Sequence, residues 1–167
     1  EKRSVLYSPT EGIPELREEI SRFMRKYEFV KSDPDDILVT IGGSQAIDLI
    51  GRLMLEPGDI VIVENPSYVN TILNWRQYGV RLIGIPMDEN GLITELLEET
   101  LKKLRSDGKF AKLIYIIPTG QNPTGLTMSM ERRKHLIELA SEYDLLIVED
   151  GAYNYLVYES IDVKPLK

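Results

Sequence analysis

Five short apolar runs, each rich in Ile, Val and Leu, recur along the chain. They lie at residues 37–41, 60–63, 81–85, 113–117 and 145–148. Their hydrophobicity is nearly continuous, whereas a strand with one exposed face alternates between polar and apolar residues. A strand that is buried on both faces requires continuous hydrophobicity, so the runs predict a mainly parallel β-sheet.

Segments with helical spacing lie among these runs. In the first of them, apolar residues step by three and four from Ile13 to Tyr27, and Pro14 suits a first helical position. Ser44 and Ser129 precede two later segments and are of a type that caps helices. The segments predicted to be helical are residues 13–27, 46–54, 68–78, 96–104 and 136–143.

Strands that alternate with helices of ten to fifteen residues form βαβ units, whose crossovers place helices on both faces of the sheet. The predicted fold class is therefore α/β, a three-layer α/β/α domain with a mainly parallel sheet. No repeat or Gly/Ser linker interrupts the chain, so we expect no domain boundary within residues 1–167.

Composition narrows the classes of protein that fit. A chain of 167 residues without cysteine has no disulfide, thiolate nucleophile or Cys-based zinc site, and the single His135 cannot build a histidine metal cluster. The excess of 27 acidic over 20 basic residues argues against a nucleic-acid binder. No apolar run is long enough to span a membrane and no signal peptide is recognisable, so we expect a cytoplasmic protein. Because the chain begins at Glu1 rather than at methionine, we expect it to be a piece of a longer protein.

Candidate chemistry follows the apolar runs, because ligands of open α/β sheets bind beyond the carboxyl ends of the strands. Gly43, Ser44 and Gln45 follow the first run and open a helix. They offer backbone N–H groups, a hydroxyl and a helix N-terminus to an anion such as phosphate. A purely structural glycine turn with a serine cap is the alternative, since the segment matches neither the dinucleotide nor the P-loop pattern.

Two further strand ends carry groups suited to a flat ligand. Tyr68 follows the second run, where its ring would either stack on a ligand or simply cover the edge of the sheet. Residues 118–125 follow the fourth run and include two prolines and two glycines. Such a rigid loop would hold Asn122 in a fixed place, although it would also serve as a structural turn.

A carboxylate follows the fifth run. Asp150 stands at the end of a buried strand, where a charge is costly unless it meets a cation or several hydrogen-bond donors. A protonated ring nitrogen would serve, and loop amides are the alternative. With Tyr153 nearby, the strand ends together suit one flat, phosphorylated, basic heterocycle.

Five phrases of the chain give a resemblance to a known family. They are YSPTEGIPELR at 7–17, GSQA at 43–46, ENPSY at 64–68, QNPTG at 121–125 and EDGAY at 149–153. In this order and spacing the chain resembles the fold-type I pyridoxal phosphate (PLP) aminotransferases of class I/II. It is most similar to the branch that contains 2-aminoadipate and kynurenine aminotransferases.

The resemblance implies a role for each residue around the cofactor ring. Tyr68 would stack on the pyridine, Asn122 and Tyr153 would hydrogen-bond its phenolic oxygen, and Asp150 would pair with the pyridinium nitrogen. The last pairing matters most, because a protonated ring is the electron sink of the reaction.

The resemblance also implies how the cofactor phosphate is held. Gly43, Ser44 and Gln45 would bind it, and Tyr7 would reach across a dimer interface to the phosphate of the neighbouring subunit. A homodimer is therefore expected, with no metal.

The resemblance departs from the family at the end of the chain. The family's Schiff-base lysine lies some thirty-odd residues beyond the Asp150 position, and Lys164 and Lys167 come too early to be that lysine. Residues 1–167 are thus predicted to be a truncated PLP-binding large domain, without the small carboxy-terminal domain and with no catalytic residue of its own. Such a fragment should be inactive and should self-associate.

For the intact protein, the resemblance implies transamination between an amino acid and 2-oxoglutarate. The donor stays open among 2-aminoadipate, aromatic and branched-chain amino acids. Three alternatives also remain: the effector-sensing domain of a winged-helix transcription regulator, a different reaction on the same scaffold such as a β-lyase, and a truncated folding unit without its own function.

Overall fold

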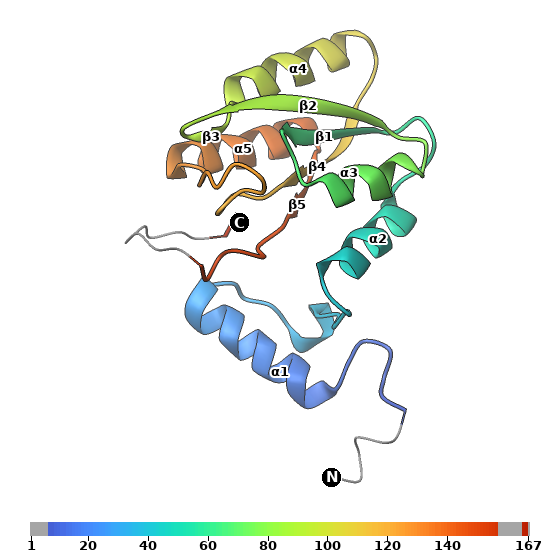
Figure 1. Cartoon of the computed structure of the whole chain (residues 1–167), viewed down its shortest axis with the longest axis vertical. Coiled ribbons are helices and arrows are strands. Elements are labelled where there is room, and N and C mark those ends of the chain that lie inside the picture. The colour runs from blue at the N-terminus through green and yellow to red at the C-terminus, as the bar shows by residue number, and fades with distance from the viewer. Residues whose placement is uncertain (1–6, 157–164, 167) are drawn as a thin grey trace. The chain divides into compact units, whose positions relative to one another are not determined.

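The computed structural model describes residues 7–156 and 165–166, which divide into two compact units (Figure 1). The first unit runs to Gly42, and the second begins at Gly43 and contains all the strands. The division falls between Gly42 and Gly43, where helix α2 begins, whereas the sequence pattern indicated no boundary.

The first unit is built around helix α1 (Pro14–Phe23), which continues as the π-helical turn η2 (Met24–Glu28) and is followed by the 3-10 turn η3 (Pro34–Asp36). Arg17 anchors α1 to η3. Its buried guanidinium donates to the Pro34 carbonyl at 2.8 Å and pairs with Asp35 at 2.7 Å. These helical turns confirm the helical spacing predicted over residues 13–27.

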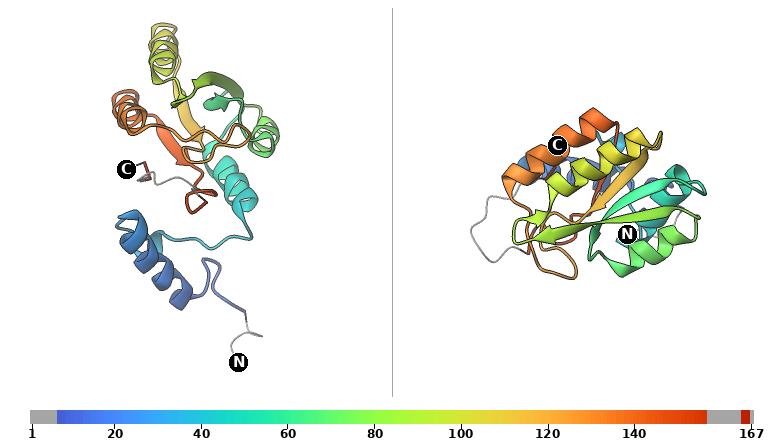
Figure 2. Two further views of the ribbon diagram at one scale, coloured as in Figure 1. Left: turned by 60° about the vertical axis from the view of Figure 1, so that its left-hand side comes forward. Right: turned by 90° about the horizontal axis from the view of Figure 1, so that it is seen from above.

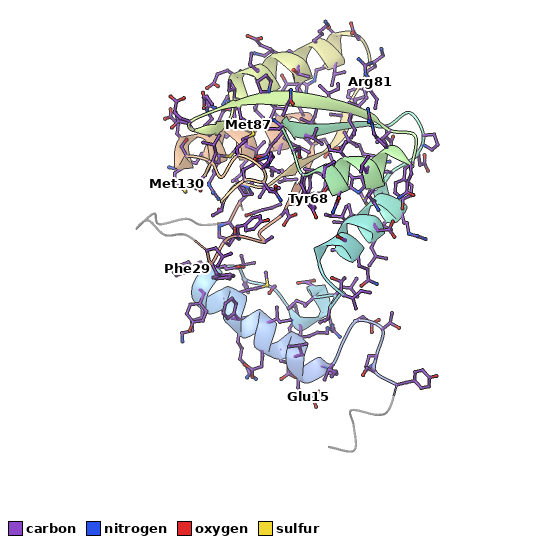
Figure 3. All side chains as sticks on the ribbon, in the orientation of Figure 1. Glu15, Phe29, Tyr68, Arg81, Met87 and Met130 are labelled. Atoms are coloured by element: carbon purple, nitrogen blue, oxygen red, sulfur yellow. The ribbon has the colours of Figure 1, made fainter. Side chains whose placement is uncertain are left out.

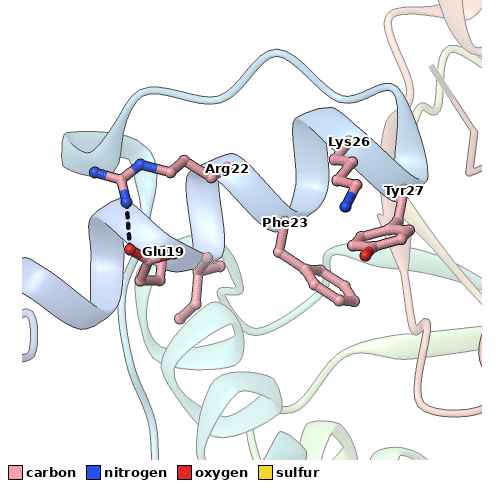
Figure 4. A pocket seen from close by; sticks show the side chains of 6 residues that line it. Glu19, Arg22, Phe23, Lys26 and Tyr27 are labelled. Atoms are coloured by element: carbon pink, nitrogen blue, oxygen red, sulfur yellow. Dashed lines mark hydrogen bonds and ion pairs between the residues drawn. The ribbon is translucent and has the colours of Figure 1, made fainter.

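One side of α1 and η2 carries aromatic and charged side chains around an open hollow (Figure 4). The Phe23 and Tyr27 rings lie 4.8 Å apart, and the Lys26 ammonium lies 4.7 Å from the centre of the Tyr27 ring. Arg22 pairs with Glu19 one turn earlier. These contacts stay on one helix and bring together no chemistry-bearing residue that the sequence singled out.

The strand predicted over residues 37–41 is not formed, and this prediction was wrong. The Val39 N–H donates to the Glu11 carbonyl at 2.9 Å, but no described strand pairs with the segment. Leu38 and Ile41 are exposed, Ile41 by 91%. Hydrophobicity marks a segment that is suited to a sheet, but a strand also needs a neighbouring ladder of N–H and C=O groups.

The second unit contains a five-stranded sheet in the order β3-β2-β1-β4-β5. Its strands are β1 (Ile60–Asn65), β2 (Arg81–Asp88), β3 (Gly91–Leu92), β4 (Ala111–Ile116) and β5 (Leu146–Glu149). β1 pairs in parallel with β2 and β4, and β4 pairs in parallel with β5. The other four predicted strands are therefore confirmed. β3 is antiparallel to β2 and was not predicted, because two residues carry no periodicity.

Helices cover both faces of this sheet (Figure 2). They are α2 (Gly43–Met54), α3 (Val69–Arg76), α4 (Thr94–Ser106) and α5 (Met130–Tyr143). α4 and α5 pack with one face into a core that includes Ile62, Ile114 and Leu136. α2 and α3 pack against the other face. The three-layer α/β/α architecture is as predicted, and the four predicted helical segments of this unit are all helices.

Trp75 is the centre of the core beneath α2 and α3. It is fully buried, its indole N–H donates to the Ile47 carbonyl at 2.9 Å, and its ring meets the Tyr115 ring edge-on at 5.6 Å. Gly51 lets α2 approach the Trp75 ring, since a Cβ atom there would lie 3.0 Å from that ring and 2.7 Å from the ring of Tyr78. This packing fixes α2 and the amino-terminal end of that helix over the sheet.

Within residues 7–156 and 165–166, no helix is long and apolar enough to cross a membrane.

Candidate functional site

A cavity of about 190 Å³ lies at the carboxyl ends of the strands of the second unit. Six of the predicted site residues line it: Gly43, Ser44, Tyr68, Asn122, Asp150 and Tyr153. They come from the start of α2 and from the segments after β1, β4 and β5. Parallel strands end at a common edge, so residues up to 110 positions apart in sequence meet in one place.

A larger and more open hollow of about 590 Å³ lies at the opposite ends of the strands and is lined in part by Asp59, Arg81, Lys112 and Asp144. Its charges are of both signs, and Lys112 is paired with Asp59 at 2.8 Å. The larger hollow is therefore lined by positive and negative side chains that partly neutralise each other, whereas the smaller cavity is lined by aromatic, amide and carboxylate groups.

The start of α2 forms one wall of the cavity. Gly43 and Ser44 line it, and the first backbone N–H groups of a helix have no acceptor within the helix. This end of the helix therefore favours an anion. Gln45 lies on the same first turn but is not among the lining residues, and Tyr7 belongs to the first unit, where its side chain is exposed.

Tyr68 immediately precedes α3 and contributes an aromatic ring to the cavity (Figure 3). Its hydroxyl accepts a hydrogen bond from the Asn70 side-chain amide at 2.7 Å. This hydrogen bond holds the hydroxyl end of the Tyr68 side chain, and the ring itself is available to a flat ligand.

Asn122 and Tyr153 both line the cavity and contact each other directly. The Asn122 amide donates to the Tyr153 hydroxyl at 3.3 Å, although the two residues lie 31 positions apart. Gly120 makes room for this approach, since its φ is +57° and a Cβ atom there would lie 3.1 Å from the Tyr153 Cβ. An amide and a phenol hydroxyl from two different loops thus converge at the cavity.

Glu64 fixes the loop that carries Asn122, and sequence reasoning did not assign it a role. Its buried carboxyl accepts hydrogen bonds from the Ile117 N–H and the Gln121 side-chain amide, both at 3.1 Å. Gln121 also donates to the Pro66 carbonyl at 2.9 Å and accepts from the Thr124 hydroxyl at 2.7 Å. The end of β1 is thereby tied to the loop after β4.

The environment of Glu64 changes its acidity. Burial raises the pKa of Glu64 to about 7, with the nearby Asp150 carboxylate adding to the rise, while the hydrogen bonds from Ile117 and Gln121 oppose it. Desolvation outweighs the donors because the carboxylate has lost nearly all contact with water.

The backbone of Asp150 continues the pairing of β5 with β4 beyond the end of β5, since its N–H donates to the Ile116 carbonyl at 2.8 Å. One carboxylate oxygen accepts from the Ala152 N–H at 3.2 Å, as the loop-amide alternative required. The other accepts from the Tyr115 hydroxyl at 2.7 Å, a contact that the sequence did not indicate because Tyr115 stands inside an apolar run. The carboxylate is therefore held at the wall of the cavity by two donors.

Comparison with known proteins places the chain in a family. The model of the family described as aminotransferase class I and II matches residues 2–166. The chain is 43% identical over 165 residues to aromatic-amino-acid aminotransferase 1 of Thermococcus litoralis, which covers 99% of this chain and 40% of that protein. The chain thus spans about 40% of the length of this relative.

Solved structures agree with this placement. An archaeal alanine:glyoxylate aminotransferase matches with a TM-score of 0.96 at 55% identity, over 99% of this chain and 41% of its own. Kynurenine aminotransferase of Pyrococcus horikoshii, solved in complex with PMP, matches with a TM-score of 0.86 at 45% identity, over 89% of this chain and 37% of its own. The expected resemblance is confirmed: the chain belongs to the aminotransferase class I and II family.

Proposed function

We propose that the intact protein catalyses PLP-dependent transfer of an amino group from an amino acid to a 2-oxo acid. The observation that carries the proposal is the cavity at the strand ends, which brings an aromatic ring, an amide–phenol pair, a carboxylate and a helix N-terminus together in a member of this family. Tyr68, Asn122 and Asp150 come from three different strand ends, so their convergence follows from the fold.

The residues present fit PLP by their chemistry. A phosphate suits the start of α2 at Gly43 and Ser44, and a flat pyridine suits the ring of Tyr68. Asn122 and Tyr153 offer a donor and a hydroxyl to a ring oxygen, and Asp150 offers a carboxylate to a ring nitrogen. When bound, the cofactor supplies an electron sink for bonds that break at the substrate's α-carbon.

We propose further roles for the two residues that lie outside the cavity lining. Gln45 would support phosphate binding from the first turn of α2, and Tyr7 would contact the phosphate of a neighbouring subunit in a homodimer. The intact enzyme would act in the cytoplasm.

For the substrates, we propose an aromatic amino acid as the donor and 2-oxoglutarate as the acceptor. The relative from Thermococcus litoralis is an aromatic-amino-acid aminotransferase, and the structure from Pyrococcus horikoshii is a kynurenine aminotransferase. 2-Aminoadipate and branched-chain amino acids are the competing donors, and the alanine:glyoxylate aminotransferase adds alanine to those worth testing.

The test loads the intact protein with PLP and adds single amino acids without any oxo acid, while absorbance is followed and the cofactor is then analysed. Conversion to pyridoxamine phosphate would establish transamination and name the donor. Binding of amino acids without that conversion would favour an effector-sensing domain over an enzyme.

Residues 1–167 alone should not turn over an amino acid with 2-oxoglutarate faster than free PLP does. No lysine is among the side chains that line the cavity in the described part of the chain, and covalent catalysis with PLP requires an amine. The purified chain is assayed beside an equal concentration of free PLP. Sustained turnover above the free cofactor would contradict the prediction and the large-domain-fragment interpretation.

A further inference from the structure

We propose that Tyr115 is a positioning residue for Asp150. Its hydroxyl donates to one carboxylate oxygen of Asp150 and so stabilises negative charge on this carboxylate, which would favour a proton on the ring nitrogen of a bound cofactor. The inference deepens the proposed function and rests on it. The contact that carries it is the 2.7 Å separation between the Tyr115 hydroxyl and Asp150 Oδ2.

The register of the sheet explains why these two residues meet. Tyr115 on β4 pairs with Val148 on β5. Side chains on a strand alternate between its faces, so Asp150, two residues beyond Val148, lies on the same face as Tyr115 and one step further along. A hydroxyl at the end of the long tyrosine side chain spans that step and reaches the carboxylate.

The Tyr115 hydroxyl is the donor in this contact. Burial raises the pKa of this hydroxyl far above its ordinary value. The neighbouring Thr71 hydroxyl opposes the rise, and the Asp150 and Glu64 carboxylates add to it. The hydroxyl is therefore protonated near neutral pH, and a carboxylate oxygen of Asp150 accepts its hydrogen.

The tyrosine is held rigidly. Its side chain is fully buried, and its ring meets the Trp75 ring edge-on, with 78° between the ring planes. Trp75 is itself fixed by its hydrogen bond to Ile47, a residue that also lines the cavity. With Ala152 donating to the other oxygen, the Asp150 carboxylate has a donor on each side and a defined plane.

The chemical consequence depends on whether the proton shared by the Asp150 carboxylate and the ring nitrogen lies on the carboxylate or on the nitrogen. A donor to a carboxylate stabilises its ionised form and lowers its affinity for a proton. Between the Asp150 carboxylate and a ring nitrogen, such a donor therefore favours the proton on the nitrogen. Without the Tyr115 hydroxyl, the proton moves toward the carboxylate and the ring loses positive charge.

The test compares the intact wild-type protein with Tyr115→Phe, each loaded with PLP labelled with ¹⁵N in the ring. The ¹⁵N chemical shift reports ring protonation without any turnover. At neutral pH we expect the ring ¹⁵N shift of the variant to move toward that of an unprotonated pyridine nitrogen, because the shared proton then lies more often on the Asp150 carboxylate.

Tyr78→Phe is the matched control. The Tyr78 hydroxyl also donates to a carboxylate, that of Asp48 at 2.9 Å, but neither residue lines the cavity. This variant should leave the ring ¹⁵N shift unchanged. An equal change in both phenylalanine variants would mean that loss of any tyrosine hydroxyl bound to a carboxylate is enough, and would overturn the inference.

A second variant keeps the test decisive if Tyr115→Phe does not fold. 3-Fluorotyrosine introduced at position 115 is a stronger donor of nearly the same shape, and it should move the ring ¹⁵N shift toward that of the protonated nitrogen. Identical ring ¹⁵N shifts in wild type and in both position-115 variants, with PLP bound, would overturn this inference alone. A wild-type protein that binds no PLP would overturn the proposed function and this inference with it.

Discussion

Two carboxyl groups near the cavity, Glu64 and Asp150, differ in what surrounds them. Glu64 is fully enclosed and accepts two hydrogen bonds from neutral groups, which do not offset its lost hydration. Asp150 is only half-buried and accepts from a backbone N–H and from Tyr115. Glu64 thus suits a structural tie that is easily neutralised, whereas Asp150 suits a charged contact with a ligand.

The raised pKa of Glu64 predicts a pH-dependent stability. In the unfolded chain this group ionises near its ordinary pKa of 4.5, whereas in the folded protein it ionises near 7. Its contribution is therefore fully present below pH 4.5 and is lost as the pH rises through 7. The loss corresponds to about 3 kcal/mol.

Urea unfolding of wild type and Glu64→Gln at pH 5 and pH 8 measures this contribution. Relative to wild type, the unfolding free energy of Glu64→Gln should be higher at pH 8 than at pH 5. Glu99→Gln, which changes an exposed carboxyl on α4, is the control and should follow wild type. If Glu64→Gln also followed wild type, the assigned environment of Glu64 would be contradicted.

At the scale of the elements, α2 carries the end of the helix that faces the cavity, and its position depends on close packing against α3. Gly51 is the point of closest approach, where a Cβ atom would lie 2.7 Å from the Tyr78 ring and 3.0 Å from the Trp75 ring. Tyr78 is tied to Asp48 on α2, and Trp75 is fully buried, so neither ring has room to move away.

Gly51→Ala should therefore destabilise the protein by about 1–3 kcal/mol, which exceeds the gain in helix propensity from alanine. Thermal or urea unfolding gives the change in free energy. Arg52→Ala, at the next position on the exposed side of α2, should cost less than about 1 kcal/mol because it removes only a surface ion pair with Asp48. A stabilised Gly51→Ala protein would show that α2 shifts freely relative to α3.

At the scale of the molecule, the second unit exposes apolar side chains on the outer surfaces of α2 and α3. Leu53 is exposed by 82% and Leu73 by 60%, with Leu49 and Val69 also exposed. Apolar surface gathered on neighbouring helices favours association. We therefore predict that residues 1–167 self-associate through the outer surfaces of α2 and α3.

Sedimentation of the purified chain at tens of micromolar should show species larger than a monomer. Leu53→Lys combined with Leu73→Lys should shift the distribution toward the monomer, because the charges would have to be desolvated in the contact. Phe110→Lys removes an equally exposed apolar side chain that lies outside α2 and α3, and should leave the distribution unchanged. A monomeric wild-type chain would contradict the prediction.

The sequence by itself determined the local elements and the residue types of the site. Helical spacing predicted α1, α2, α3, α4 and α5, and continuous apolar runs predicted β1, β2, β4 and β5. Both signals arise because burial on one or both faces of an element sets the residue types of its neighbouring positions. The segments after the strands identified Tyr68, Asn122 and Asp150, since parallel strands bring their carboxyl ends to one edge whatever their order.

Only the tertiary structure decided which residues support that site and which apolar run stays out of the sheet. Glu64 and Tyr115 look like ordinary strand residues in the sequence, and their roles arise from donors and acceptors more than 30 positions away. Residues 37–41 have the composition of a strand, yet no described strand pairs with them. Hydrogen bonds between distant segments depend on register and distance, which local hydrophobicity does not encode.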